Sequence, residues 1–430
     1  MVESNIIRDL LVSTLRKIIG DTWETLYETA CETYGINGEN PKPDDIPKLG
    51  RGLVEVLKPY GEEKLTLFLK TMRQIQIILD KENVEKEVIG EILLYIGDLF
   101  LVIGDFKEAL SNYFEVANIA TTSDHKVLVA RAIKRVGDVY SAKGDYATAI
   151  DKYEEAKSIS EGVGDYGGVA EALRELGEIE WKQGKFNKAK ERIKVAIEIA
   201  EKSQNLILKE KILLTFARIY LYQGDVQVAH QYLKTAIEIL KKIRDPFEIC
   251  RIYNTFGVLY YTLEEYEKAS EYFRETVNQS KKMGETLTYT YGLINLGSCY
   301  IHLSKIEEAE KLLDEARMLV TKLENRYALG ILYSILGRLN AAKMNWELAK
   351  ENFANAISTL EALNLRLNLA WTYTYIADMY IAKGDEGIAA TYLDKAKDIF
   401  TEIGSKYLSE RYEKKAKELA MKARAKIQPR

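Results

Sequence analysis

Cys299 and His302 are the two residues whose types and spacing come closest to metal chemistry. They lie three positions apart, and this separation places both side chains on one face of a helix. A zinc site takes four protein ligands, or three and an open position, and the chain has only three histidines and three cysteines, which are scattered. We therefore predict no metal, no cofactor and no catalytic residue. Cys299 is interpreted as a buried thiol beside a binding-groove histidine.

Residues 162–167, Gly-Val-Gly-Asp-Tyr-Gly, fit the G-x-G-x-x-G pattern of dinucleotide-binding proteins. That pattern binds a pyrophosphate only when it follows a strand and opens the helix of a βαβ unit. Here it joins two segments with helical periodicity, so we interpret it as a turn. No Walker A loop occurs, and we predict that the chain is not an enzyme.

Composition excludes several classes of protein. The 430 residues are too many for one ordinary core. Apolar residues make up 47%, charged residues 29%, and the net charge is −4, so no nucleic-acid partner is expected. No run of 18 apolar residues and no signal peptide occur, so we expect no membrane span and a cytoplasmic location.

The sequence repeats itself with a fixed period, and this repeat decides the fold. A small residue recurs at one position, and alanine recurs twelve residues later in every copy. The two columns are Gly97, Gly137, Gly177, Ala217, Gly257, Gly297, Gly337 and Ala377, and Ala109, Ala149, Ala189, Ala229, Ala269, Ala309, Ala349 and Ala389. Each copy has helical apolar spacing on both sides of a turn, which favours two helices that cross at the small residues. One such pair cannot bury its apolar face, so neighbouring pairs must stack.

These columns resemble the tetratricopeptide repeat. In the second copy the match is carried by Val136-Gly137, Tyr140, Ala149, Tyr153 and Ala156. That repeat has about 34 residues, whereas a period of 40 resembles the longer repeats of kinesin light chain and related scaffolds. The copies depart from the pattern at the tyrosine position and at the turn glycine, and these departures are Glu180 and Asn340, and Glu264, Ser304 and Met344.

We predict an all-α fold: a right-handed α-solenoid of about eight helix-turn-helix repeats. Residues 84–403 form the repeats, and 61–83 a half repeat or linking helix. Residues 1–60 form a small N-terminal helical domain, with helices near 6–19, 22–35 and 49–59. Residues 404–430 form a charged capping helix that gives the array a polar end.

The resemblance implies a concave face lined by the first helix of each pair. The predicted peptide-binding residues on it are Lys211, Arg218, Tyr222, Arg251, Asn254, Tyr261, Tyr291, Asn295, Ser298, His302 and Arg338. Lys211, Arg218 and Arg251 are expected to converge with no acid beside them, which favours an acidic guest. Asn254 and Asn295 resemble the asparagines that hold a peptide backbone in related repeats.

Two functions are compatible with these features. The first is a non-enzymatic scaffold that binds a peptide or partner segment in the concave groove. The alternative is a signalling regulator that resembles the bacterial Rap type, in which the N-terminal helical domain acts on a partner while the repeats sense a peptide. The sequence leaves the oligomeric state and the identity of the partner open.

Overall fold

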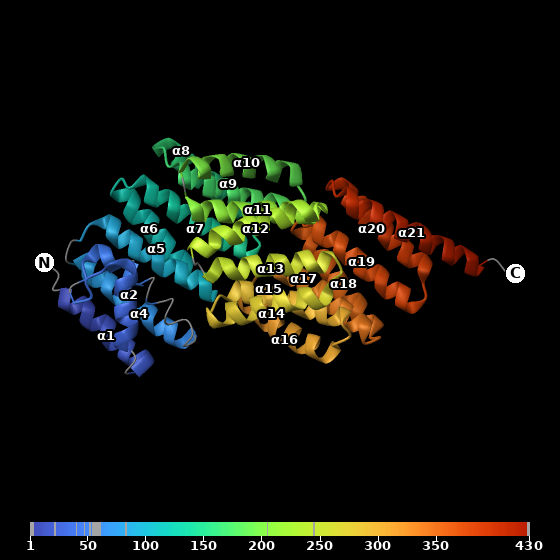
Figure 1. The fold of residues 1–430 in the computed structure, drawn as a ribbon, viewed down its shortest axis with the longest axis horizontal. Helices are drawn as coiled ribbons and strands as arrows, with labels where there is room; N and C mark the ends of the chain where they lie inside the picture. The colour runs from blue at the N-terminus through green and yellow to red at the C-terminus, as the bar shows by residue number, and fades with distance from the viewer. Residues whose placement is uncertain are drawn as a thin grey trace. The chain divides into compact units, whose positions relative to one another are not determined.

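The computed structural model describes residues 4–20, 23–39, 41–46, 48–50, 53, 62–81, 84–203, 205–243 and 246–427. Every regular element in these ranges is a helix (Figure 1). The chain begins with α1 (Ser4–Ile19), α2 (Trp23–Tyr34), the 3-10 helix η2 (Pro43–Asp45) and α4 (Glu62–Lys81). The first two predicted helices are confirmed, whereas most of the helix predicted over 49–59 lies outside the described residues.

Eight helix pairs follow, and their first helices begin at regular intervals of one repeat period. The pairs are α5 (Lys86–Ile103) and α6 (Phe106–Thr122), α7 (Lys126–Lys143) and α8 (Tyr146–Val163), α9 (Tyr166–Lys182) and α10 (Phe186–Ser203), α11 (Leu206–Gln223) and α12 (Val226–Ile243), α13 (Pro246–Thr262) and α14 (Tyr266–Lys282), α15 (Thr286–His302) and α16 (Ile306–Lys322), α17 (Arg326–Ala342) and α18 (Trp346–Ala362), and α19 (Arg366–Lys383) and α20 (Glu386–Glu402). Helix α21 (Lys406–Ile427) follows them. The prediction of an all-α solenoid of helix pairs is confirmed.

Contacts divide the chain into two compact units. Unit 1 comprises Met1–Tyr140, Asp151–Val169 and Gln279–Leu287, and unit 2 comprises Ser141–Ile150, Ala170–Asn278 and Thr288–Arg430. All eleven predicted binding residues belong to unit 2. The domain limits expected from the sequence remain predictions.

The small-residue column marks the helix crossings. A Cβ atom placed on Gly137 would come within 2.7 Å of the Tyr153 ring, and one on Gly297 within 2.9 Å of Leu313. Both distances are far below the 3.5–4.0 Å of an ordinary carbon contact. In both repeats the large side chain belongs to the second helix of the pair, so the column lets the second helix pack directly on the first.

The turn inside each pair uses a left-handed backbone conformation. Gly144 and Gly384 adopt φ angles of 83° and 82°, which glycine tolerates because it has no Cβ. In repeats five to seven the same position is Glu264, Ser304 and Met344, and these residues keep φ angles of 63°, 57° and 59°. The departures noted in the sequence therefore change the residue and leave the turn intact.

Three tyrosines of the repeat, Tyr220, Tyr260 and Tyr380, form ring stacks between the two helices of their pair. Tyr220 stacks on Tyr232, twelve residues later, with ring centroids 5.6 Å apart. In repeat three Glu180 replaces the tyrosine, and its carboxylate lies 2.8 Å from Nε of Arg192, again twelve residues later. One ion pair thus replaces one aromatic stack at the same place.

Within unit 2, residues far apart in the chain also touch at the turns. The contacts join Lys143 to Glu324 (2.8 Å), the carbonyl oxygen of Gln223 to the hydroxyl of Ser405 (3.1 Å) and Glu264 to Arg411. Gln223 and Ser405 are separated by 182 positions. Turns of early repeats are therefore held against the C-terminal part of the same unit.

Candidate functional site

Successive first helices of unit 2 are joined by side-chain hydrogen bonds between residues 37, 40 or 41 positions apart. Because these separations are close to one repeat length, the bonds connect equivalent faces of neighbouring repeats. The bonds are Thr215 to Glu178 (2.8 Å), Arg218 to Glu178 (3.0 Å), Asn295 to Asn254 (3.0 Å), Tyr261 with Ser298 (3.0 Å) and Arg338 to Ser298 (2.9 Å). We call these residues and the side chains that contact them the first-helix face.

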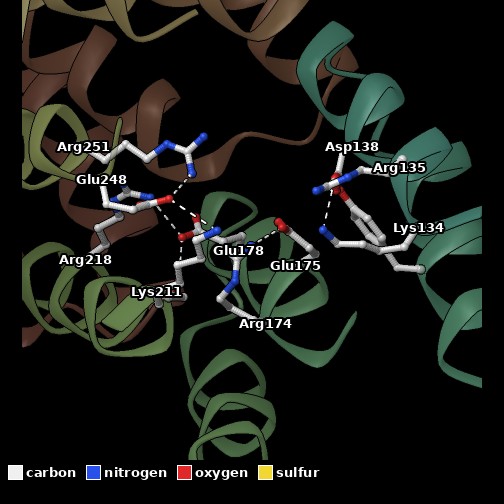
Figure 2. Close-up of polar contacts among 12 residues, drawn as sticks. Lys134, Arg135, Asp138, Arg174, Glu175, Glu178, Lys211, Arg218, Glu248 and Arg251 are labelled. Carbon is white, nitrogen blue, oxygen red and sulfur yellow. Dashed lines mark hydrogen bonds and ion pairs between the residues drawn. The ribbon is translucent and has the colours of Figure 1, made fainter. Parts of the chain in front are cut away.

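The three cations that were expected to lack an acid each pair with a glutamate (Figure 2). Nη1 of Arg218 lies 3.0 Å from Oε1 of Glu178. Nζ of Lys211 and Nη1 of Arg251 lie 3.4 and 3.1 Å from Oε1 of Glu248. Both glutamates are buried, with exposed fractions of 6% and 4%. The expectation that these three cations have no acid beside them is therefore wrong.

Both acids belong to first helices, and the position of one of them, Glu178, could have been predicted from the sequence. Glu178 precedes Arg218 by one repeat length, so the period itself places them side by side. Glu248 lies in the first turn of α13 and is not among the residues predicted to line the concave face. Burial raises the pKa of Glu178, but Arg218 and its basic neighbours outweigh burial and lower it to about 2.

Glu210 is a functional candidate that sequence reasoning missed. Its side chain is 1% exposed, and neither carboxyl oxygen has a hydrogen-bond partner among the described residues. Burial, and then the charge of Glu248, raise its pKa to about 8. The equivalent residues in the other repeats are all small: Gly90, Ala130, Ala170, Cys250, Thr290, Gly330 and Ala370. Glu210 could have been found from the sequence, because it is the one acidic residue at a repeat position where every other copy has a small residue.

Tyr222 and Tyr291 lie in aromatic surroundings on this face. Tyr222 stacks on Trp181 with centroids 4.9 Å apart and planes inclined by 14°. Burial raises the pKa of Tyr222 to about 12. The hydroxyl of Tyr291 accepts a hydrogen bond of 3.0 Å from Asn325, and its ring meets Tyr327 edge-on. Both predicted residues therefore belong to packed aromatic clusters.

Arg338 and three other predicted residues come together around its guanidinium. Nη1 donates to the hydroxyls of Tyr261 and Ser298, each at 2.9 Å, and Nη2 donates to Nε2 of His302 at 2.6 Å. The ring centroid of Tyr375 lies 4.4 Å from Cζ. We call these five residues the Arg338 cluster, and Arg338 itself is 8% exposed.

His302 is neutral in this cluster. The ring of Tyr266 stacks on it with centroids 3.9 Å apart. Desolvation, and then the positive charge of Arg338, lower the pKa of His302 to about 3. Cys299 is buried among Ala269, Phe273 and Leu296. Among the described residues no group of three or more histidine, cysteine, aspartate or glutamate side chains is arranged to hold a metal ion.

Asn254 and Asn295 pair with each other. Nδ2 of Asn295 donates to Oδ1 of Asn254 at 3.0 Å, and both residues are half-buried. The bond uses one donor and one acceptor of the pair, so the Nδ2 group of Asn254 and Oδ1 of Asn295 keep their own hydrogen-bonding capacity. The pair thus presents a donor and an acceptor next to each other.

The comparisons with known proteins agree with this architecture. Residues 128–202 and 208–282 match the model of the tetratricopeptide repeat family. These two stretches carry tetratricopeptide repeats. The resemblance to the longer kinesin-light-chain type remains a prediction. A search of the curated proteins found no match.

The tetratricopeptide array is similar to solved structures of Rap proteins. One is a Rap protein complexed with Competence and Sporulation Factor, with 14% identity, a TM-score of 0.60, and 84% of this chain and 99% of that chain covered. Another is the Rap conjugation gene regulator of the plasmid pLS20 in complex with the Phr* peptide, with 17% identity, a TM-score of 0.54, and 84% and 95% covered. Identities this low show a shared fold. None of the helices in the described ranges is long and apolar enough to cross a membrane.

Proposed function

We propose that this chain is a non-enzymatic interaction protein that binds a peptide, or an extended segment of a partner protein, along the first-helix face of unit 2. The Asn254–Asn295 pair is the observation that carries the proposal. An extended backbone presents N–H and C=O groups that need partners, and the pair offers one acceptor and one donor next to each other. The similar structure of a Rap regulator with the Phr* peptide supports the same role for this fold.

Aromatic side chains near the asparagine pair suit the side chains of such a guest. Trp181 and Tyr222 stack on each other in the two repeats before the pair. Tyr261 lies on the same helix as Asn254 and contacts Ser298 of the helix that carries Asn295. Large aromatic residues and arginine contribute most of the binding energy at protein interfaces. Lys211, Arg218 and Arg251 each contact a buried glutamate, and Lys211 and Arg251 share Glu248. Three cations with no acid beside them would have favoured an acidic guest, and that reason is therefore lost.

A regulator of the Rap type is the second candidate. The similar Rap structures extend over 84% of this chain, and one of them is named a conjugation gene regulator. In this second function the helices α1, α2 and α4 act on a protein partner while the first-helix face binds a peptide. Thr14 of α1 and Thr71 of α4 share a buried hydrogen bond of 2.8 Å, which ties the N-terminal helices together.

A displayed library of random peptides tests the proposal. We expect the wild-type chain to select peptides, and Asn254→Ala with Asn295→Ala to bind them about ten- to a hundredfold more weakly, since two backbone hydrogen bonds are lost. Asn352→Ala is the matched control, because Asn352 lies on the second helix α18 and its side chain donates to Leu348 of the same helix. Affinity is measured by fluorescence anisotropy, and helix content by circular dichroism.

Two results would contradict the proposal. The first is a library that yields no binding peptide. The second is a double variant that binds selected peptides as tightly as the control does. A protein partner retained equally by wild type and double variant would direct attention to α1, α2 and α4 instead.

A further inference from the structure

We propose that Arg338 binds a carboxylate of the guest, and that this cluster, not the cations of repeats four and five, makes the first-helix face select an anion. The inference rests on the proposed function and names the chemistry of its ligand. Its basis is that the charge of Arg338 is buried beside neutral groups, while its guanidinium keeps donors that an anion can use.

The partners of Arg338 differ from those of the other cations on this face. Arg218 meets the carboxylate of Glu178, and Arg251 meets that of Glu248. Among the described residues, the groups that contact Arg338 are two hydroxyls, an imidazole and the ring of Tyr375, all uncharged. A buried charge without an opposite charge beside it is costly, and a bound anion removes that cost.

The acid that acts on Arg338 through space is already occupied. Asp378 is exposed, and its Oδ1 lies 2.9 Å from Nζ of Lys415 on α21. Glu264, the other acid near this end of α13, pairs with Arg411. Each of these two carboxylates has its own cation, and Arg338 is left as the surplus positive charge.

The guanidinium retains donors in the arrangement that a carboxylate uses. The hydrogen bonds to Tyr261, Ser298 and His302 occupy both hydrogens of Nη1 and one of Nη2. Arginine has five N–H donors, so the hydrogen of Nε and the second of Nη2 remain. Two adjacent N–H groups bind the two oxygens of a carboxylate in parallel. His302 is exposed, and we expect a guest to reach the cluster from its side.

The net charge of the cluster favours a carboxylate over a phosphate. His302 stays uncharged above about pH 3, because its pKa is about 3. The site therefore offers a single positive charge. A phosphate monoester carries about −1.5 to −2 at neutral pH and is usually bound by several arginines, whereas a carboxylate carries −1. The carboxylate has two possible sources, the C-terminus of a peptide and an aspartate or glutamate side chain.

The test uses peptides selected from the library by the full wild-type chain. Each is made in four forms: unchanged, with a C-terminal amide, with aspartate and glutamate replaced by asparagine and glutamine, and with both changes. We expect at least one neutralising change to weaken binding to wild type by about tenfold or more, as for the loss of a charge-assisted pair. The form that loses affinity identifies the source of the carboxylate.

Arg338→Met is expected to bind all four forms with equal, weak affinity. Arg274→Met is the matched control, because Arg274 also donates to a tyrosine hydroxyl, that of Tyr300 at 3.3 Å, but from the second helix α14. The control should keep the wild-type preference. Tyr261→Phe is the second variant, and it should reduce the preference several-fold while Arg338 stays in place.

The wild-type measurement alone can overturn the inference, even if Arg338→Met fails to fold. Equal affinity of wild type for all four forms would reject a carboxylate site while leaving peptide binding intact. A preference that survives in folded Arg338→Met would move the site elsewhere. Failure to select any peptide would instead reject the proposed function itself.

Discussion

Arg218 and Arg338 occupy the same position in their repeats, one residue after the small residue of the helix crossing, yet their surroundings are opposite. Nη1 of Arg218 donates to the residue 40 positions earlier, Glu178, at 3.0 Å. Nη1 of Arg338 donates to the residue 40 positions earlier, Ser298, at 2.9 Å. The geometry is shared, and only the neighbouring repeat differs. For these two arginines, availability to a ligand is therefore decided by the residue at the equivalent position of the preceding repeat.

The largest expected effect is a difference in the stability lost when the surroundings of Arg218 and of Arg338 are altered. Glu178→Ala removes the acceptor of Arg218, Thr215 and the Trp181 indole. We expect a loss of about 3–5 kcal/mol in the free energy of unfolding, as for one broken buried ion pair. Arg338→Met leaves no buried acid behind, so a smaller loss of about 1–3 kcal/mol is expected. Urea unfolding followed by circular dichroism measures both, and equal losses would remove the contrast.

The pH dependence of stability tests Glu210, the buried acid whose carboxyl oxygens have no hydrogen-bond partner among the described residues. The pKa of Glu210 in the folded chain is about 8, above the ordinary value of about 4.3. Between these values the folded chain holds a proton that the unfolded chain has released, so Glu210 lowers stability as pH rises, by about 1.4 kcal/mol per pH unit. Glu178, with its lowered pKa, acts in the opposite sense and loses its contribution only below about pH 4.

Glu210→Gln should therefore stabilise the chain far more at pH 8 than at pH 5. Urea unfolding at both values measures the difference. Glu351→Gln, on the exposed side of α18, is the control and should show no such difference. An equal response of Glu210→Gln at the two pH values would show that this carboxyl is ionised in the folded chain.

A core variant separates loss of stability from loss of recognition. Ala189 is fully buried at the crossing of α9 and α10. Ala189→Leu should overpack this crossing and cost about 1–3 kcal/mol, without changing the ratio of affinities for carboxylate and amide peptides. The melting temperature and the peptide titrations check the two halves of the prediction. An unchanged melting temperature would contradict the assignment of this column to the crossings.

The smallest effect concerns the turn after the helix that carries Arg338. Met344 is 71% exposed and has a φ of 59°, a region that costs a side chain with a Cβ about 1 kcal/mol or more. Met344→Gly should raise stability by about 0.5–1 kcal/mol and leave peptide binding unchanged. Gly384→Ala, at the same turn of the next pair, should lower stability by a similar amount. Melting curves of the two variants should therefore shift in opposite directions.

The fold was predictable because the constraint on it is repeated. A crossing such as that of Gly137 with Tyr153 leaves no room for a large side chain, so glycine or alanine recurs at every crossing and the period can be counted. The replacement of a tyrosine stack by Glu180 and Arg192 also follows a fixed offset of twelve residues. The recurring small residue and the offset of twelve residues can be recognised in one sequence, because each repeat packs on its neighbours in the same way.

The candidate site was predictable only in part. The repeat phase placed Tyr261, Ser298, His302 and Arg338 on one face, and the structure joins them. It did not reveal that buried glutamates pair with the neighbouring cations, because Glu178 lies one repeat before Arg218 and Glu248 lies outside the residues predicted to line the concave face. The charge of such a face depends on residues of neighbouring repeats. The residues 37 and 40 positions away from a cation must be checked for an acid before the cation is taken as unpaired.

The turn contacts of unit 2 alter how this part of the chain should unfold. In an open repeat array each repeat meets only its neighbours, so stability behaves as a one-dimensional sum and the ends fray independently. The bond between Gln223 and Ser405 spans 182 positions, and the ion pair of Glu264 with Arg411 spans 147. Such closures couple the last repeats to the middle ones. Unit 2 should then melt in a single cooperative step, and it should fold more slowly than a linear array of equal length, because long loops must close before these contacts form.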